Sequence, residues 1–143
     1  MPEYTLTKKE ARQFLLCKQG LLGKYKFEDK TGVLDFIRQA GCIQFDPIDL
    51  CGKSTEILLH SRVKHFSKSM LYELLYIDRD LVDYFDKQLS IFLTEDWPFF
   101  ARERKRHRQW ERSHEKILKV RDTIREAIRS YGPLNSGDLD LSE

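Results

Sequence analysis

The sequence has 143 residues, which is enough for one domain, or for one domain and the start of another. A hydrophobic fraction of 41%, with nine Phe, six Tyr and two Trp, is sufficient to build a core. The charged fraction is 34% but the net charge is only +2, which excludes a simple polybasic protein and makes the distribution of charge more informative than its sum.

Cysteine usage and hydropathy indicate a cytoplasmic protein. The three cysteines, Cys17, Cys42 and Cys51, are an odd number without CxxC spacing, which favours reduced thiols over a disulfide framework. Residues 1–10 lack the apolar segment of a signal peptide, and no apolar run approaches the roughly 20 residues of a membrane span. The His and Cys residues show no zinc-ligand spacing, so we expect no metal and no other cofactor.

Two helices are predicted in the first 40 residues. The Thr7–Glu10 pair has the pattern of a capping box, which predicts a helix to about Gln19, with Gly20 after its end. Residues 21–30 are expected to form a polar loop before a second helix over residues 31–40. The apolar residues expected on the inner faces are Ala11, Phe14 and Leu15 in the first helix, and Val33, Leu34, Phe36 and Ile37 in the second.

The stretch after the second helix carries the strongest chemical signal. Gly41 stops the helix, and residues 42–46 predict a short strand whose polar side chains, Gln44 and Asp46, share one face. Pro47 lacks a backbone N–H, so it ends the strand or confines it to a sheet edge. An amide and a carboxylate held on one stiff element are suited to position a water molecule against an electrophile. The alternative is that both are the solvated face of an edge strand.

A turn over residues 47–52 and a third helix over residues 53–63 are predicted next. The residues that this helix is expected to bury are Ile57, Leu58 and one of Leu59 and His60. Arg62 and Lys64, together with His65, are exposed candidates for contacts with phosphate groups. An ordinary solvated surface is the alternative interpretation.

The next segment predicts a helix followed by a β-hairpin. Ser67 precedes a fourth helix over residues 70–75, and residues 81–85 and 89–93 are two strand-like runs separated by a short polar connection. Helices followed by a hairpin are the order of elements in a winged helix. We therefore predict a mainly α fold with a short β-hairpin, of winged-helix (helix-turn-helix) type, by analogy of fold alone. Lys87 in the connection is a candidate phosphate contact, or an ordinary solvated lysine.

From Trp97 onward the sequence is helical in pattern and strongly basic. Cations with an interleaved aromatic residue suit a phosphate backbone, although a solvated helix face has the same composition. The candidate DNA contacts in this helix are Arg102, Arg104, Lys105, Arg106 and Arg108.

An amphipathic helix is predicted over residues 114–130, with a stop at Tyr131-Gly132-Pro133 and a new helix cap near Asn135. We expect a first winged-helix-like domain over residues 1–112, a connecting helix over 113–131, and the truncated start of a second winged-helix domain over 132–143. A sequence that ends as an element begins suggests a fragment.

Several motifs together resemble the YcaQ-like family of winged-helix DNA glycosylases. The main one is Gln44-Phe45-Asp46-Pro47-Ile48-Asp49-Leu50-Cys51-Gly52, followed by Leu58-Leu59-His60-Ser61-Arg62-Val63. Shorter matches are Gln19-Gly20-Leu21, Asp83-Tyr84-Phe85, Glu95-Asp96-Trp97-Pro98 and Gly132-Pro133-Leu134. The likeness covers nearly all of this chain, but only the first third or so of a family member.

The resemblance implies a monofunctional DNA glycosylase that hydrolyses the N-glycosidic bond of alkylated bases and unhooks interstrand crosslinks in double-stranded DNA. Asp46 would activate the attacking water and stabilise the developing cation, Gln44 would orient that water, and Phe45 would be buried between them. We expect the full-length parent to be active and this fragment to be inactive alone.

The sequence departs from the family pattern at two positions. Many members carry a His where Lys87 stands, and some carry one where Thr55 stands. These departures fit a subfamily of different specificity, or one without glycosylase activity. The alternatives are therefore a non-catalytic winged-helix DNA-binding protein or regulator, and a protein-interaction scaffold that uses the helix over 114–130.

Overall fold

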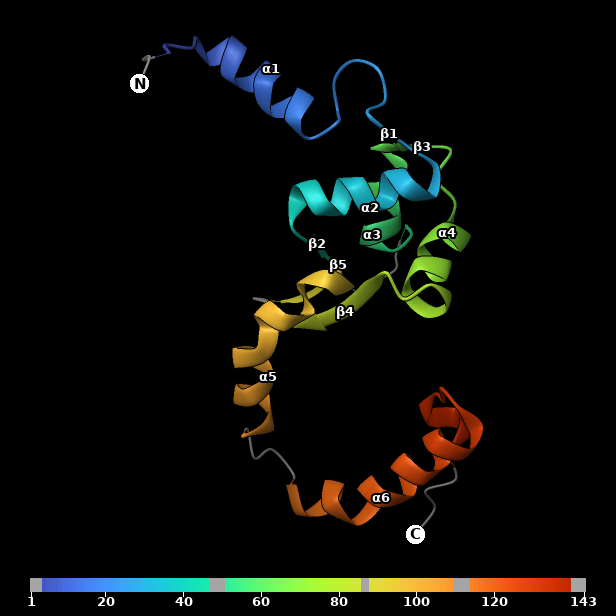
Figure 1. Ribbon diagram of the computed structural model, residues 1–143. Coiled ribbons are helices and arrows are strands. Elements are labelled where there is room, and N and C mark those ends of the chain that lie inside the picture. Colours follow the sequence, from blue (N-terminus) through green and yellow to red (C-terminus); the bar gives the residue numbers. More distant parts are fainter. Residues whose placement is uncertain (1–3, 47–50, 86–87, 110–113, 140–143) are drawn as a thin grey trace. The chain divides into compact units, whose positions relative to one another are not determined.

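The computed structural model describes residues 4–46, 51–85, 88–109 and 114–139, which divide into a first compact unit within residues 1–103 and a second within residues 104–143. The described chain is mainly helical with a small antiparallel sheet, as the sequence predicts (Figure 1). None of the helices in these ranges is both long enough and apolar enough to cross a membrane.

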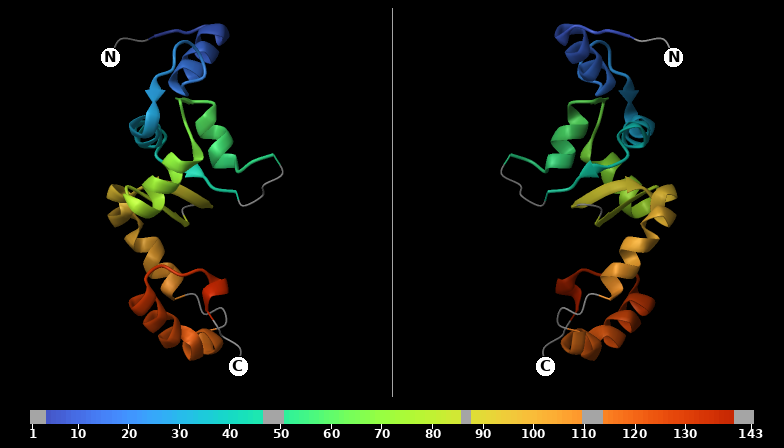
Figure 2. Two further views of the ribbon diagram at one scale, coloured as in Figure 1. Left: turned by 90° about the vertical axis from the view of Figure 1, so that its right-hand side faces the viewer. Right: turned by 90° about the vertical axis from the view of Figure 1, so that its left-hand side faces the viewer.

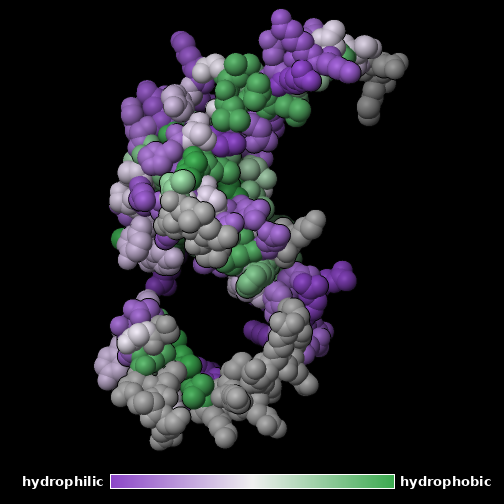
Figure 3. Space-filling view, turned by 180° about the vertical axis from the view of Figure 1, so that it is seen from behind, coloured by the Kyte–Doolittle hydropathy of each residue, from purple (hydrophilic) through white to green (hydrophobic). Residues whose placement is uncertain are grey.

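Helix α1 (Lys8–Lys18) begins at the predicted capping box. The Thr7 N–H donates to Glu10 Oε2 at 2.8 Å, and the Glu10 N–H donates to Thr7 Oγ1 at 3.2 Å. The predicted inner face is wrong, because Phe14 and Leu15 are 62% and 58% exposed and α1 buries no residue within the described chain. Figure 3 shows hydrophobic surface where α1 leads into the following loop. An amphipathic pattern identifies the apolar side of a helix but not whether another element covers it.

The segment after α1 is more ordered than a polar loop. Strand β1 (Phe27–Glu28) pairs in parallel with β3 (Val63–Lys64), and helix α2 (Asp29–Ala40) starts two residues earlier than predicted. Phe27 is buried and its ring meets the edge of Phe36 at 5.4 Å between centroids, so an isolated aromatic residue joins the core. The predicted apolar side of α2 is confirmed. The core residues of α2 are Val33, Phe36 and Ile37, with Leu34 partly buried.

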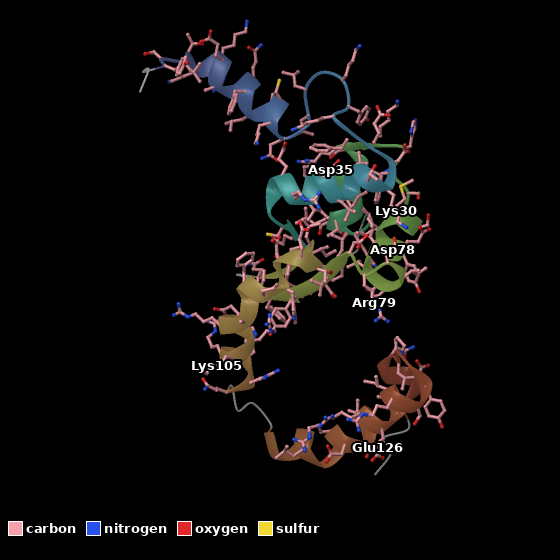
Figure 4. The ribbon with its side chains drawn as sticks, in the orientation of Figure 1. Lys30, Asp35, Asp78, Arg79, Lys105 and Glu126 are labelled. Carbon is pink, nitrogen blue, oxygen red and sulfur yellow. The ribbon has the colours of Figure 1, made fainter. Side chains whose placement is uncertain are left out.

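Three helical segments follow in the first unit: α3 (Ser54–His60), α4 (Lys68–Tyr72) and the π-helix η1 (Glu73–Ile77). Leu59 anchors α3 in the core, whereas Ile57 is half exposed, so its predicted burial is wrong. The fourth helix starts two residues before the predicted position and continues as the π-helix. Lys30 of α2 pairs with Glu73 of η1 at 2.7 Å and with Asp78, the residue after η1, at 2.5 Å. Lys30 and Asp78 are labelled in Figure 4.

The sheet contains β2 (Ile43–Gln44), β4 (Leu81–Phe85) and β5 (Leu89–Leu93) in the order β2-β5-β4, and all neighbours are antiparallel. The bounds of the predicted hairpin are confirmed. One face of the sheet joins the hydrophobic core through Ile43, Leu81, Ile91 and Leu93. The 3₁₀-helix η2 (Thr94–Phe100) packs aromatic rings on Phe92 of the other face. Two further views of these elements are given in Figure 2.

The basic helix α5 (Ala101–Arg108) begins in the first unit and ends in the second. The second unit also contains α6 (His114–Tyr131), which confirms the predicted amphipathic helix, and the short 3₁₀-helix η3 (Ser136–Asp138), which has a capping box at Asn135. Gly132 ends α6 with a φ of +83°, a value that L-residues with a side chain rarely adopt. The predicted division at residues 112 and 131, and the winged-helix type of the fold, stay predictions.

Candidate active site at the sheet edge

The site predicted from the sequence lies on and just beyond β2, an edge strand of the described sheet. Gln44 is paired with Ser90 of β5, and the Phe45 N–H donates to the Leu89 carbonyl at 2.9 Å. Backbone pairing therefore continues one residue past the strand, to the position immediately before Asp46. The predicted strand over 42–46 is confirmed in its central part and is shorter than expected.

Side chains along this segment alternate between the core and the solvent. Ile43 is buried, Gln44 is exposed, and Phe45 is partly buried against the core cluster. The Gln44 amide Nε2 donates to the Gln88 Oε1 at 2.6 Å. Asp46, which is half-buried, is the next residue of this segment. Asp46 lies beyond the bounds of β2, and its place on the same side as Gln44 stays a prediction.

The backbone of Asp46 is also held by helix α3. The Asp46 N–H donates to the Ser54 hydroxyl oxygen at 3.1 Å, and this hydrogen bond is partly buried. Ser54 is the first residue of α3, and Leu59 fixes the same helix in the core. Two rigid elements, β5 through Phe45 and α3 through Ser54, therefore position the residue that the sequence nominates as the catalytic carboxylate.

Thr55, the residue at one of the two departures from the family pattern, faces inward. It is 1% exposed, and its hydroxyl oxygen has no hydrogen-bond partner within the described parts of the chain. The side chain of Thr55 is therefore turned into the fold and not toward the solvent-exposed Gln44. The predicted turn over residues 47–52 falls largely on residues 47–50, which lie outside the described residues.

An aromatic layer adjoins the Gln44 face of the sheet. The register places Gln44, Ser90 and Tyr84 in one cross-strand row. The Tyr84 ring meets the Trp97 ring at 5.1 Å between centroids, edge to face. Sequence reasoning identified the segments that contain Tyr84 and Trp97 as family-like but did not predict that they meet on this face.

Arg62 and Lys64 are half-buried, and the side chain of Lys64 is 42% exposed. One terminal nitrogen of Arg62 donates to the Leu58 carbonyl at 3.2 Å, and its guanidinium lies 5.5 Å from the centroid of the Phe36 ring. A cation at the C-terminal end of α3 complements the helix dipole. Lys64 pairs with Glu28 across the β1–β3 pair at 3.3 Å. Both cations have structural partners, and their contact with DNA stays a prediction.

The remaining predicted DNA contacts are on α5 or in the hairpin connection. Arg102, Lys105, Arg106 and Arg108 are exposed, Arg104 is half-buried, and Lys105 is labelled in Figure 4. Lys87 lies outside the described residues. Within the described ranges, the His, Cys, Asp and Glu side chains form no group of three that is suited to hold a metal ion. The three cysteines are free thiols, as predicted.

Comparison with known proteins identifies the family. The model of the AlkZ-like family, described as DNA glycosylase AlkZ-like, matches residues 37–142, which include Gln44, Asp46 and the whole of α5. No curated protein and no solved structure matched the chain. Because the family model covers most of the sequence, the chain belongs to the AlkZ-like family of DNA glycosylases. This agrees with the resemblance found in the sequence, and the substrate of such a family is DNA.

Proposed function

We propose that the protein hydrolyses the N-glycosidic bond of an alkylated base in double-stranded DNA, with Asp46 and Gln44 as the catalytic pair. The observation that carries the proposal is the double attachment of the Asp46 segment, through the Phe45–Leu89 and Asp46–Ser54 hydrogen bonds, directly beside an exposed Gln44. A catalytic carboxylate must be held in place before the substrate binds, and rigid elements serve this purpose better than loops.

The chemistry requires few groups. Alkylation at N7 makes a guanine cationic, so cleavage of the bond between its N9 and C1′ releases a neutral base that keeps the electron pair of that bond. The sugar becomes oxocarbenium-like, and water adds to C1′ while Asp46 accepts a proton from it. Gln44 orients the same water by hydrogen bonding. No strong general acid is needed, because the leaving base is already activated.

We propose that interstrand crosslinks between alkylated bases are also substrates, since unhooking breaks the same glycosidic bond. DNA contact is assigned to the cations of α5 and to a winged-helix arrangement of the first unit. Exposed arginine and lysine side chains suit the phosphate backbone.

The test is base release by the full-length protein from a duplex that contains one N7-methylguanine, with a crosslinked duplex in parallel. We expect the wild type to release the base and Asp46→Asn to lose at least about 100-fold in single-turnover rate, because general base catalysis contributes roughly that much. Asp35→Asn is the matched control, since Asp35 is an exposed carboxylate on α2 that pairs with Arg38 at 3.1 Å. An Asp46→Asn variant as fast as the wild type would remove Asp46 from the chemistry.

The second candidate function, a non-catalytic winged-helix DNA-binding protein, is favoured by the exposed cations of α5. It predicts DNA binding that weakens steeply with salt and no base release from any alkylated duplex. The same base-release experiment separates the two candidates.

A further inference from the structure

The apolar side chain of Phe99 is exposed to solvent. It is 82% exposed, although it lies among aromatic residues that pack on the sheet. Its neighbour Phe100 stacks on the buried Phe92 ring at 4.0 Å between centroids. Trp97, three residues before Phe100, lies nearly parallel to the same Phe92 ring at 6.5 Å. The three-residue period of a 3₁₀-helix turns Trp97 and Phe100 inward and leaves Phe99 outside.

The segment that presents Phe99 is fixed at its start as well. The Thr94 N–H donates to the Asp80 carbonyl at 2.8 Å, and the Thr94 hydroxyl donates to the Arg79 carbonyl at 2.7 Å. Glu95 pairs with Arg38 of α2 at 3.3 Å. These hydrogen bonds, the ion pair and the ring contacts fix the position of η2. Phe99 is therefore exposed on a well-packed segment.

Phe99 belongs to the segment that packs on Tyr84 and Phe92, which lie on the same face of the sheet as Gln44. The even-numbered residues of the hairpin, Tyr84 and Phe92, share that face with Gln44, and Trp97 contacts both rings. One turn after Phe99, the exposed Arg102 supplies a positive charge on the same continuous helical segment. An apolar tip followed by a cation is the combination that inserts between base pairs while neighbouring cations hold the phosphates.

We propose that Phe99 is a DNA wedge, which inserts into the base stack and fills the space left when the damaged base is extruded. This inference depends on the proposed function in one respect, which is that a glycosylase must extrude the damaged base from the duplex. A base inside a duplex is out of reach of Asp46, and its unstacking and unpairing cost a few kcal/mol. A rigid aromatic side chain offsets part of that cost by stacking in place of the lost base.

The experiment uses the full-length protein at saturating concentration on a duplex with 2-aminopurine beside N7-methylguanine. We expect the wild type to raise 2-aminopurine fluorescence, Phe99→Ala to lose most of that rise, and Phe99→Leu, which keeps a large apolar side chain, to restore it. Phe14→Ala, which changes an equally apolar and 62% exposed residue on α1, is the matched control and is expected to behave as the wild type. Thermal melting establishes that each variant is folded.

Base release provides the second readout. We expect Phe99→Ala to slow single-turnover release at least about tenfold when the lesion is paired with cytosine, and less than about threefold when it faces an abasic site, where little unstacking is needed. No fluorescence rise with the wild type, or an equal rise with Phe99→Ala, overturns the wedge. A fluorescence difference without any base release would keep the wedge and overturn the proposed glycosylase activity.

Discussion

The hydrogen bond between Ser54 and Asp46 provides a direct test of how the site is positioned. Ser54→Ala removes the hydroxyl oxygen that accepts the Asp46 N–H at 3.1 Å, and it changes no side chain of the proposed catalytic pair. The variant leaves a partly buried backbone N–H without this acceptor. The segment is then expected to spend more time in positions where that N–H reaches water and the Asp46 carboxylate is displaced.

The size of the effect follows from the cost of the lost acceptor. Leaving a buried donor unsatisfied costs about 1–3 kcal/mol, and partial burial of this hydrogen bond favours the lower half of that range. Since about 1.4 kcal/mol corresponds to a factor of ten in an equilibrium constant, the ratio of competent to displaced positions of Asp46 is expected to fall roughly five- to thirtyfold. The rate of base release follows the competent fraction and would fall by up to that factor, while affinity for DNA would change little.

The assay is single-turnover release of N7-methylguanine together with a separate measurement of DNA affinity. Ser54→Thr keeps a hydroxyl and is expected to recover most of the rate. Ser61→Ala is the matched control, because Ser61 lies at the other end of α3 and its hydroxyl donates to the Leu58 carbonyl at 2.7 Å. An unchanged rate in Ser54→Ala, or an equal loss in Ser61→Ala, would refute the positioning argument.

Two further predictions concern the packing and charge pairing of α2. Gly32→Ala is expected to lower the free energy of unfolding by about 1–3 kcal/mol in denaturant titrations, because the added Cβ would lie 2.8 Å from the Phe27 carbonyl carbon. Hydrogen bonds to the carboxylates of Asp78 and then Glu73 raise the pKa of Lys30. Because the pKa of Lys30 is higher in the folded state, its ion pairs stabilise the protein at pH values below the unfolded-state pKa of about 10.4. This stabilisation is lost as the pH rises through the folded-state pKa. Above about pH 10, the thermal stability of the wild type is therefore expected to fall more than that of Lys30→Met.

Controls for both variants lie in the same part of the chain. Thr31→Ala adds no atoms against β1 and is expected to leave stability unchanged or slightly raised, so a loss as large as that of Gly32→Ala would contradict the steric argument. Lys8→Met removes an exposed lysine on α1 and is expected to keep the alkaline loss of stability seen in the wild type. If Lys30→Met shows that same alkaline loss, the pairing of Lys30 is not its source.

Local patterns predicted the elements whose formation depends on neighbouring residues. The predicted bounds of the two hairpin strands agree with the observed ones, because alternating β-forming residues and a short connection act within about a dozen positions. The capping box of α1 was predicted for the same reason, since both of its hydrogen bonds join residues three apart. These features need no knowledge of the rest of the chain.

Elements that depend on distant partners were missed. Phe27 reads as an aromatic residue in a polar loop, and only its parallel pairing with Val63 and its contact with Phe36 make it part of the core. The opposite error occurred at Phe14, where an apolar helical position lacks a covering element in the described chain. Both errors arise because burial is decided by tertiary contacts that a single sequence does not display.

The residues of the candidate site also fall into two groups, those that local sequence patterns indicate and those that only tertiary contacts reveal. Gln44 and Asp46 were nominated from spacing on a strand and from a family motif, whereas Ser54 and Phe99 gave no sequence signal of their own. Ser54 becomes interesting only because its hydroxyl meets the Asp46 N–H from another element. Phe99 stands out only because Trp97 and Phe100 on either side of it are turned toward the sheet.

The edge position of β2 explains how one short segment can serve both folding and chemistry. An inner strand such as β5 has neighbours on both sides, and its residues from Ser90 to Leu93 are all buried. β2 pairs only with β5 in the described sheet, so Ile43 and Phe45 hold it against the core while Gln44 stays open to solvent. A water molecule and an extruded base can approach such an edge without opening the core. An exposed polar residue at this edge therefore lowers the free energy of unfolding little, because the core requires only the inward-facing residues of β2.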